Sequence, residues 1–407
     1  MTVYINPVAA KPASALHAGK RIKSIDLLRG VIMIIMLLDH VRIYFHRDAF
    51  LYSPTDLTQT TAPLFFTRWI THYCAPVFVF LAGLSAYLYG AGKNRRALSV
   101  FLLTRGIWLV LAECLIVSLE WSFNPSYPFF NLQVIWAIGI SMIVLSALVH
   151  LHRWVLVLTG IVLVAGHNML DNIHVTGNGA GSFVWALLHD PGEFTFGRLA
   201  VFVHYPVIAW IGIMTLGYCA GSLYSRNANA GKRRGLLLLS GFAAITLFIL
   251  LRLNNGYGDA IHWEQQKSTL FDLLSFLNVT KYPPSLLYTL MTVGPALVFL
   301  AIAENPLPAW AEKIIVLGKT PMFYYLLHIF LVHLLAVLAA VITGYHWTDM
   351  ILTSRVNRAP ELKGYGFSLP MVYLVWITAT VILYPCCRWF NRYKTAHSAT
   401  QWWLKYL

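Results

Sequence analysis

Ten long apolar stretches constrain the fold of this chain more than any other feature of its sequence. They cover residues 25–45, 63–89, 97–121, 132–151, 154–170, 199–224, 236–253, 284–303, 321–343 and 369–389. A helix needs about 20 such residues to cross roughly 30 Å of hydrocarbon. A helix also satisfies its own backbone hydrogen bonds in lipid. The sequence therefore predicts an all-α fold, a polytopic transmembrane helix bundle of about ten spans.

The composition excludes a soluble domain. Charged residues make up 11% of the 407 residues and hydrophobic residues 58%, whereas soluble domains carry about 25% charged residues. The net charge of +14 resides in short loops between apolar stretches. This pattern indicates membrane lipid as a partner and not nucleic acid. The five cysteines lie in or beside apolar stretches without metal-ligand spacing, so we predict neither a disulfide framework nor a metal.

The distribution of Lys and Arg predicts the topology. With the N-terminus inside, the inner segments hold more than twice as many Lys and Arg residues as the outer segments. This bias favours both termini on the cytoplasmic side. We predict a cytoplasmic tail over 1–24, a transmembrane domain over 25–389 and an interfacial cytoplasmic tail over 390–407. No apolar core of a signal peptide occurs in 1–24.

The loops assigned to the outside are the longer ones, and they are rich in Gly, Asn, Asp, His and Pro. They cover residues 171–198, 254–283 and 344–368. Long external loops of this kind are expected to frame a site. The inner loops are short, and the basic loop 225–235 carries a charge pattern that the topology alone explains.

The first apolar stretch carries ionisable residues, which are costly in lipid and therefore point to function. Asp39, Arg42 and His46 follow one another at i, i+3 and i+7, which places them on one helical face over about 10 Å. A carboxylate beside an imidazole can orient it for base catalysis. An Asp39–Arg42 ion pair with His46 at the water interface is the structural alternative. Asp26 and Arg29 repeat the i, i+3 spacing near the inner surface.

Other stretches add polar residues that the bundle could bring together. His72 precedes Pro76, and the proline is expected to kink that helix. Glu113 is a candidate counter-ion for Arg42. His328 follows two tyrosines and is a better site candidate than His333, which faces another direction. No haem or zinc motif accompanies these histidines.

The first stretch resembles a known family. Residues 21–30 (Arg-Ile-Lys-Ser-Ile-Asp-Leu-Leu-Arg-Gly), with Asp39-His40 and Tyr44-Phe45-His46, are similar to the start of the heparan-α-glucosaminide N-acetyltransferase catalytic domain, especially its bacterial branch. Stretches 67–83, 130–139, 281–286 and 317–328 are also similar, so the resemblance extends over nearly the whole chain. The lysosomal branch carries a short glycine-containing insertion that this chain lacks.

The resemblance implies a transmembrane N- or O-acetyltransferase in a bacterial inner membrane. Acetyl-CoA would be the co-substrate from the cytoplasm, without a metal, and an amine or hydroxyl of an external sugar-like molecule would be the acceptor. His46 takes the place of the family's active histidine and Asp39 that of its asparagine. We assign acceptor binding to His40, Arg42, His72, Glu113 and His328, and CoA binding to Arg29, Arg105 and Lys281.

Three alternatives stay open at this stage. His46 could act as a general base or could itself accept the acetyl group. A transporter or flippase for an envelope precursor would also contain buried charges, although the lack of an internal repeat weighs against it. A structural membrane subunit is a third class of function, in which Asp39 and His46 could be replaced without functional loss. In any of these classes the chain could form a homodimer.

Overall fold

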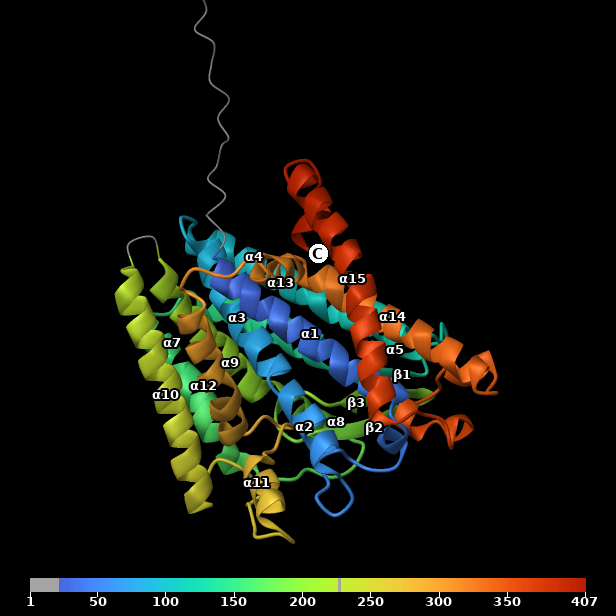
Figure 1. Cartoon of the computed structure of the whole chain (residues 1–407). Helices are drawn as coiled ribbons and strands as arrows, with labels where there is room; N and C mark the ends of the chain where they lie inside the picture. The colour runs from blue at the N-terminus through green and yellow to red at the C-terminus, as the bar shows by residue number, and fades with distance from the viewer. Residues whose placement is uncertain (1–21, 226–227) are drawn as a thin grey trace, which may run out of the picture.

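The computed structural model describes residues 22–225 and 228–407, with the side chain of Lys405 excepted. Most of the predicted tail 1–24, and Arg226 of the basic loop, lie outside this description. The described chain is mostly helical (Figure 1). Its α-helices are α1 (Lys23–Phe45), α2 (Ala62–Thr71), α3 (Cys74–Gly90), α4 (Arg95–Ala112), α5 (Ser118–Ser122), α6 (Val134–Leu148), α7 (Arg153–Gly166), α8 (Ala180–Leu188), α9 (Val207–Ala220), α10 (Ala230–Asn254), α11 (Thr269–Leu277), α12 (Leu286–Ile302), α13 (Ala311–Gly318), α14 (Pro321–Ile342) and α15 (Leu369–His397).

Seven helical segments among the described residues are long and apolar enough to cross a membrane. Two shorter apolar helices, α6 and α12, accompany them. Helix α1 is also long, with 23 residues. The charged residues buried along it distinguish it from the seven apolar segments. Together these segments correspond to the ten predicted stretches, so the chain is an integral membrane protein. The exact number of spans stays a prediction.

The loops predicted to be inside lie at one end of the bundle and those predicted to be outside lie at the other, as the predicted topology requires. Lys23 at the start of α1 forms an ion pair with Glu312 of α13, and Arg233 of α10 pairs with Glu304. At the opposite end, the Asn278 amide donates to the carbonyl of Thr55 at 3.1 Å. In Figure 1, α13 and the start of α1 lie towards the top, whereas α11 lies at the bottom. The side of the membrane that each end faces stays a prediction.

A small sheet corrects the all-α prediction. Strands β1 (Phe129–Leu132), β2 (Gly192–Phe196) and β3 (Leu199–Val203) form a sheet in the order β1-β3-β2. β1 pairs in parallel with β3, and β2 pairs with it in antiparallel. Gly197, at a φ of 62°, allows the two-residue hairpin turn between β2 and β3. The stretch predicted as a span from 199 therefore begins as a strand, and its helix begins only at Val207.

The predicted helix over 63–89 is interrupted one turn before Pro76. Proline has no N–H to donate to the carbonyl four residues earlier, which here belongs to His72. Helix α2 ends at Thr71 and α3 begins at Cys74. The hydroxyl of Tyr288 from α12 donates to the His72 carbonyl at 2.7 Å. A side chain thus replaces the missing helical hydrogen bond, and the two helices meet in a fixed bend.

Glycine allows α3 and α9 to pack with their backbones in contact. A Cβ on Gly83 of α3 would lie 2.0 Å from the Met214 carbonyl oxygen, and one on Gly217 of α9 would lie 2.1 Å from that of Phe80. No side chain can occupy such spaces without moving backbone. Small residues at helix contacts are the usual device for close association in membranes.

We predict that Gly83→Ala destabilises the protein by about 1–3 kcal/mol, because the added methyl group separates α3 from α9. The measurement is chemical unfolding of the purified protein in detergent. Gly235→Ala in α10 is the control, since a Cβ there meets nothing within 4 Å. Equal stabilities of the two variants would contradict the close packing.

A polar latch joins two of the long loops over the sheet. Glu193 of β2 accepts hydrogen bonds from Arg355 at 2.7 Å and from Arg358 at 2.7 Å. A second nitrogen of Arg355 lies 2.5 Å from Nε2 of His204. Because Arg355 can only donate, His204 accepts through a neutral ring. Burial and the neighbouring Arg355 lower the pKa of His204 from 6.5 to about 4.

The latch is predicted to weaken in mild acid. The pKa of His204 is about 6.5 in the unfolded chain and about 4 in the fold, so the unfolded chain binds more protons between these values and stability falls as the pH falls through that window. Hydrogen exchange of 192–203 should therefore be faster at pH 5 than at pH 7, after correction for the intrinsic rate. His204→Gln, which does not titrate, should abolish the difference, whereas a difference that persists in this variant would exclude His204 as its cause.

Candidate active site

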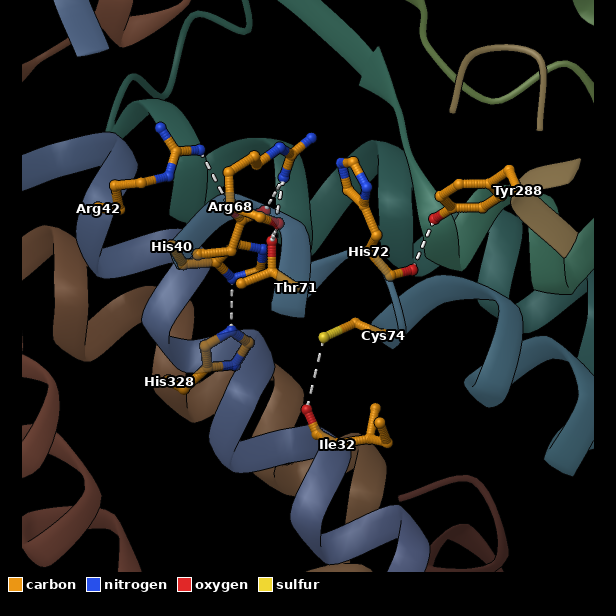
Figure 2. Close-up of polar contacts among 10 residues, drawn as sticks. Ile32, His40, Arg42, Arg68, Thr71, His72, Cys74, Tyr288 and His328 are labelled. Atoms are coloured by element: carbon orange, nitrogen blue, oxygen red, sulfur yellow. Dashed lines mark hydrogen bonds and ion pairs between the residues drawn. The ribbon is translucent and has the colours of Figure 1, made fainter. Parts of the chain in front are cut away.

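One buried carboxylate near the end of α1 joins two arginines. Asp39 Oδ1 accepts from Arg42 at 2.9 Å within α1, and Asp39 Oδ2 accepts from Arg68 of α2 at 2.5 Å. Asp39 and Arg42 are buried. Figure 2 shows Arg42 and Arg68 approaching the same place from different helices. The Asp39–Arg42 ion pair is thus present, and it is extended by an arginine that the sequence analysis had not assigned.

A chain of hydrogen bonds passes from α14 to α1 through two imidazoles. His328 Nδ1 lies 3.0 Å from the carbonyl oxygen of Tyr324, and its Nε2 lies 2.6 Å from His40 Nδ1 (Figure 2). A carbonyl oxygen only accepts, so His328 carries its proton on Nδ1. Its Nε2 then accepts from His40 Nδ1–H. This order leaves Nε2 of His40 as the nitrogen with a free lone pair, as a general base requires.

A cavity of about 30 Å³ lies beside Asp39 and His40. A volume of about 10–15 Å³ holds one water, so this cavity holds about two waters or one small functional group. Polar side chains from five separate parts of the chain reach it. The lining comprises Met36, Asp39, His40, Thr71, Cys74, Ala75, Phe78, Gln133, Val134, Tyr205 and Lys281.

Positive charge is in excess around the cavity. Asp39 forms ion pairs with Arg42 and Arg68, and Lys281 also acts on it electrostatically. Lys281 is buried, and its described contact is with the ring of Tyr282 at 5.2 Å. Nε of Arg42 is buried and has no hydrogen-bond partner among the described residues. An anionic group, or an oxygen that gains negative charge, would complete this arrangement.

His46 lies apart from the cavity. It ends α1, its amide donates to the carbonyl of Arg42 at 3.0 Å, and it pairs as an isolated bridge with Phe367. Among the described residues no hydrogen bond joins it to Asp39. Nδ1 of its buried ring has no partner there. Burial lowers the pKa of His46, and the nearby Asp48 carboxylate opposes the shift.

The other two residues assigned to acceptor binding, His72 and Glu113, lie in different parts of the bundle. His72 is buried beside Tyr288, with ring centroids 5.6 Å apart. Glu113 does not pair with Arg42, because its Oε2 accepts from the backbone N–H of Trp136 at 3.0 Å. The suggested Glu113–Arg42 pair is therefore wrong. Glu113 begins a π-helical turn, Glu113–Val117, where its carboxylate fixes the start of α6.

The three residues assigned to CoA are not brought together. Arg29 donates to Asp26 at 3.0 Å, to the Gly318 carbonyl at 3.0 Å and to Ser85 at 2.9 Å. Arg105 of α4 lies 5.9 Å from the ring of Tyr406. Lys281 lines the Asp39 cavity, about 15 Å along α1 from the level of Arg29.

Sequence reasoning missed Arg68, Gln133 and Tyr205. Arg68 stands among the apolar residues of a predicted span, so its charge was a usable signal. Gln133 and Tyr205 lie beside strands β1 and β3 and carry no helical spacing. Their place at the cavity follows from the sheet, which the sequence did not predict.

Comparison with known proteins identifies the family of the chain. The family model described as "Heparan-alpha-glucosaminide N-acetyltransferase, catalytic" matches residues 21–251, more than half of the chain. The chain belongs to this family. The match includes α1, Arg68, His72 and Gln133, whereas the similar stretches 281–286 and 317–328 lie beyond it. No curated protein sequence matches the chain significantly. Family membership implies a membrane acetyltransferase.

We predict that Asp39→Asn lowers the free energy of unfolding by about 3–5 kcal/mol, because it leaves the buried Arg42 and the partly buried Arg68 without their carboxylate. Unfolding of the purified protein in detergent measures the loss. Glu361→Gln, at an exposed carboxylate, is the matched control. A variant as stable as the control would show that the shared carboxylate does not hold α1 to α2.

Proposed function

We propose that the chain transfers an acetyl group from cytoplasmic acetyl-CoA to an amine or hydroxyl group of an external sugar-like acceptor, in a bacterial inner membrane. The single observation that carries the proposal is the relay from the Tyr324 carbonyl through His328 to His40 beside a polar cavity. The family supports the class of reaction. The geometry supports a base on α1 and a place for the reacting carbonyl.

In the proposed reaction, Nε2 of His40 takes the proton from the acceptor as its nitrogen or oxygen attacks the thioester carbonyl. The new C–N or C–O bond forms, the C–S bond breaks, and the proton passes from His40 to the departing thiolate of CoA. His328 holds His40 in the required tautomer. The charge of Asp39 lies next to the imidazolium that forms.

The excess positive charge suits the transition state of this reaction. The carbonyl oxygen gains negative charge during attack, and a fixed cation in a dry site stabilises it more than water does. Lys281 lines the cavity and can take this role. We therefore propose Lys281 for the oxyanion, in place of the CoA phosphates. Arg29 and Arg105, nearer the other end, stay proposals for CoA.

The cavity has room only for the reacting groups of acetyl-CoA and the acceptor. About 30 Å³ admits an acetyl group but not the pantetheine arm, so the helices that line the cavity must separate for acetyl-CoA to enter. His46 would then stand near the external end of the path. This position fits contact with the acceptor, although the family resemblance assigns His46 the catalytic role.

Two variants distinguish the histidines. We expect His40→Ala to reduce thiol release from acetyl-CoA by roughly 10²–10⁴-fold, the contribution typical of a general base, in purified protein supplied with a panel of amino sugars. We expect His46→Ala to affect the Michaelis constant for the acceptor more than the turnover number.

The exposed His346 supplies the control variant, His346→Ala, which should retain full turnover. Full turnover in His40→Ala, together with loss in His46→Ala, would return the base role to His46. Full turnover in both variants would remove both histidines from the mechanism. Turnover of an acceptor without release of CoA would contradict acetyl transfer itself.

A further inference from the structure

A second group of converging side chains lies away from the cavity, where α7 ends. His167 begins the short 3-10 turn His167–Leu170, Asp171 follows that turn, and His189 comes just after α8. One nitrogen or oxygen atom from each of the three lies within 4.8 Å of the others. The proposed acetyl transfer uses none of these residues.

The imidazole of His167 is buried beside the backbone of Pro284. Its exposed fraction is 3%, and neither ring nitrogen has a partner at good hydrogen-bond geometry among the described residues. One of the two nitrogens carries a proton in the neutral ring, and a buried unsatisfied donor costs about 1–3 kcal/mol. The ring lies 5.5 Å from that of His189, centroid to centroid. A cation between the two rings would bind the lone pair, and the N–H is left to face the backbone of Pro284.

His189 and Asp171 already face each other. Nε2 of His189 lies 3.1 Å from Oδ1 of Asp171, and the His189 ring is 2% exposed. The second carboxylate oxygen accepts from the Asn168 amide at 2.8 Å, and the oxygen of that amide accepts from the Leu286 N–H at 2.9 Å. Supporting hydrogen bonds of this kind orient the ligands in metal sites.

We propose that His167, Asp171 and His189 bind one divalent transition-metal ion, for which zinc is the best fit. Two imidazoles and a carboxylate are ligands that zinc accepts, at about 2.0–2.2 Å. A tetrahedral site then needs the three ligand atoms to approach somewhat closer than they stand now. The fourth position is left to water on the side of Asp171, which is only partly buried.

The ion would hold a long loop against the bundle. His189 lies shortly before β2, and β2 carries Glu193 of the polar latch. The ligands therefore join the end of α7 to the sheet whose neighbouring residues reach the cavity. In this role the metal orders the loop 171–191 and takes no part in the acetyl transfer.

The simpler alternative is a hydrogen bond from His189 to Asp171 without any ion. It explains two of the three residues but leaves the lone pair of the buried His167 ring without a partner of good geometry among the described residues. The same loop contains a matched pair for comparison, because Nδ1 of His174 lies 2.9 Å from Asp190 at an exposed position. His189, a proposed zinc ligand, can thus be compared within one segment with His174, which among the described residues pairs only with a carboxylate.

The experiment uses the full chain, purified in detergent through a tag without histidine and dialysed against metal-free buffer. Elemental analysis should find one zinc ion per chain in the wild type and in His174→Ala, and a loss of more than tenfold in His167→Asn and in His189→Asn. A chelator should lower the melting temperature of the wild type and speed hydrogen exchange in 171–191. Zinc added afterwards should reverse both changes.

Cobalt binding to the wild type keeps the test independent of how the variants fold. Co²⁺ added to the chelated protein should give the strong visible absorption of a tetrahedral site, and zinc should displace it. Equal zinc content in the wild type and in the double variant His167→Asn/His189→Asn would overturn the proposal. A wild type that holds no zinc, gives no cobalt spectrum and does not respond to zinc would overturn it as well.

Discussion

The carboxylate of Asp39 is the constraint on which the rest of the site depends. It is buried and accepts from two arginines, one on its own helix and one on α2. Removing two guanidinium groups from water is expensive unless a carboxylate meets them with good geometry. The position of α2 relative to α1 is therefore fixed by charge as well as by packing. His40 follows Asp39 directly, so the same contact also determines where the imidazole can lie.

The helices were predictable because membrane spans are long and their apolar composition is distinctive. Each of the ten predicted stretches contains a helix, and the bend near Pro76 followed from a missing N–H. The sheet was not predictable in the same way. Residues 199–203 are apolar and run on into a helix, so their composition does not distinguish a short strand from the start of a span. Their partners in β1 and β2 come from distant segments.

The types of residue in the site were predictable from the sequence, but the contact partner of each residue was not. Charges within an apolar stretch marked Asp39 and Arg42, and their helical spacing gave the ion pair between them. Helical spacing on α1 also connected Asp39 to His46, whereas the tertiary structure connects its neighbour His40 to His328 of α14. No periodicity along one helix can identify a contact between two helices distant in the chain. Arg68 carried the same signal of a charge within a predicted span, but its partner Asp39 lies on another helix.

The junction between α2 and α3 gives the bundle a pivot close to its reactive centre. Helix α3 is held along its length against α9 by glycine contacts, but α2 is connected to it only through residues 72–73, where the helical ladder is interrupted. Swinging α2 outwards would require the loss of the Tyr288–His72 hydrogen bond and the Arg68–Asp39 ion pair, while the inner half of the bundle stayed in place. Admission of a bulky substrate and unmasking of the buried acid would then be one and the same movement.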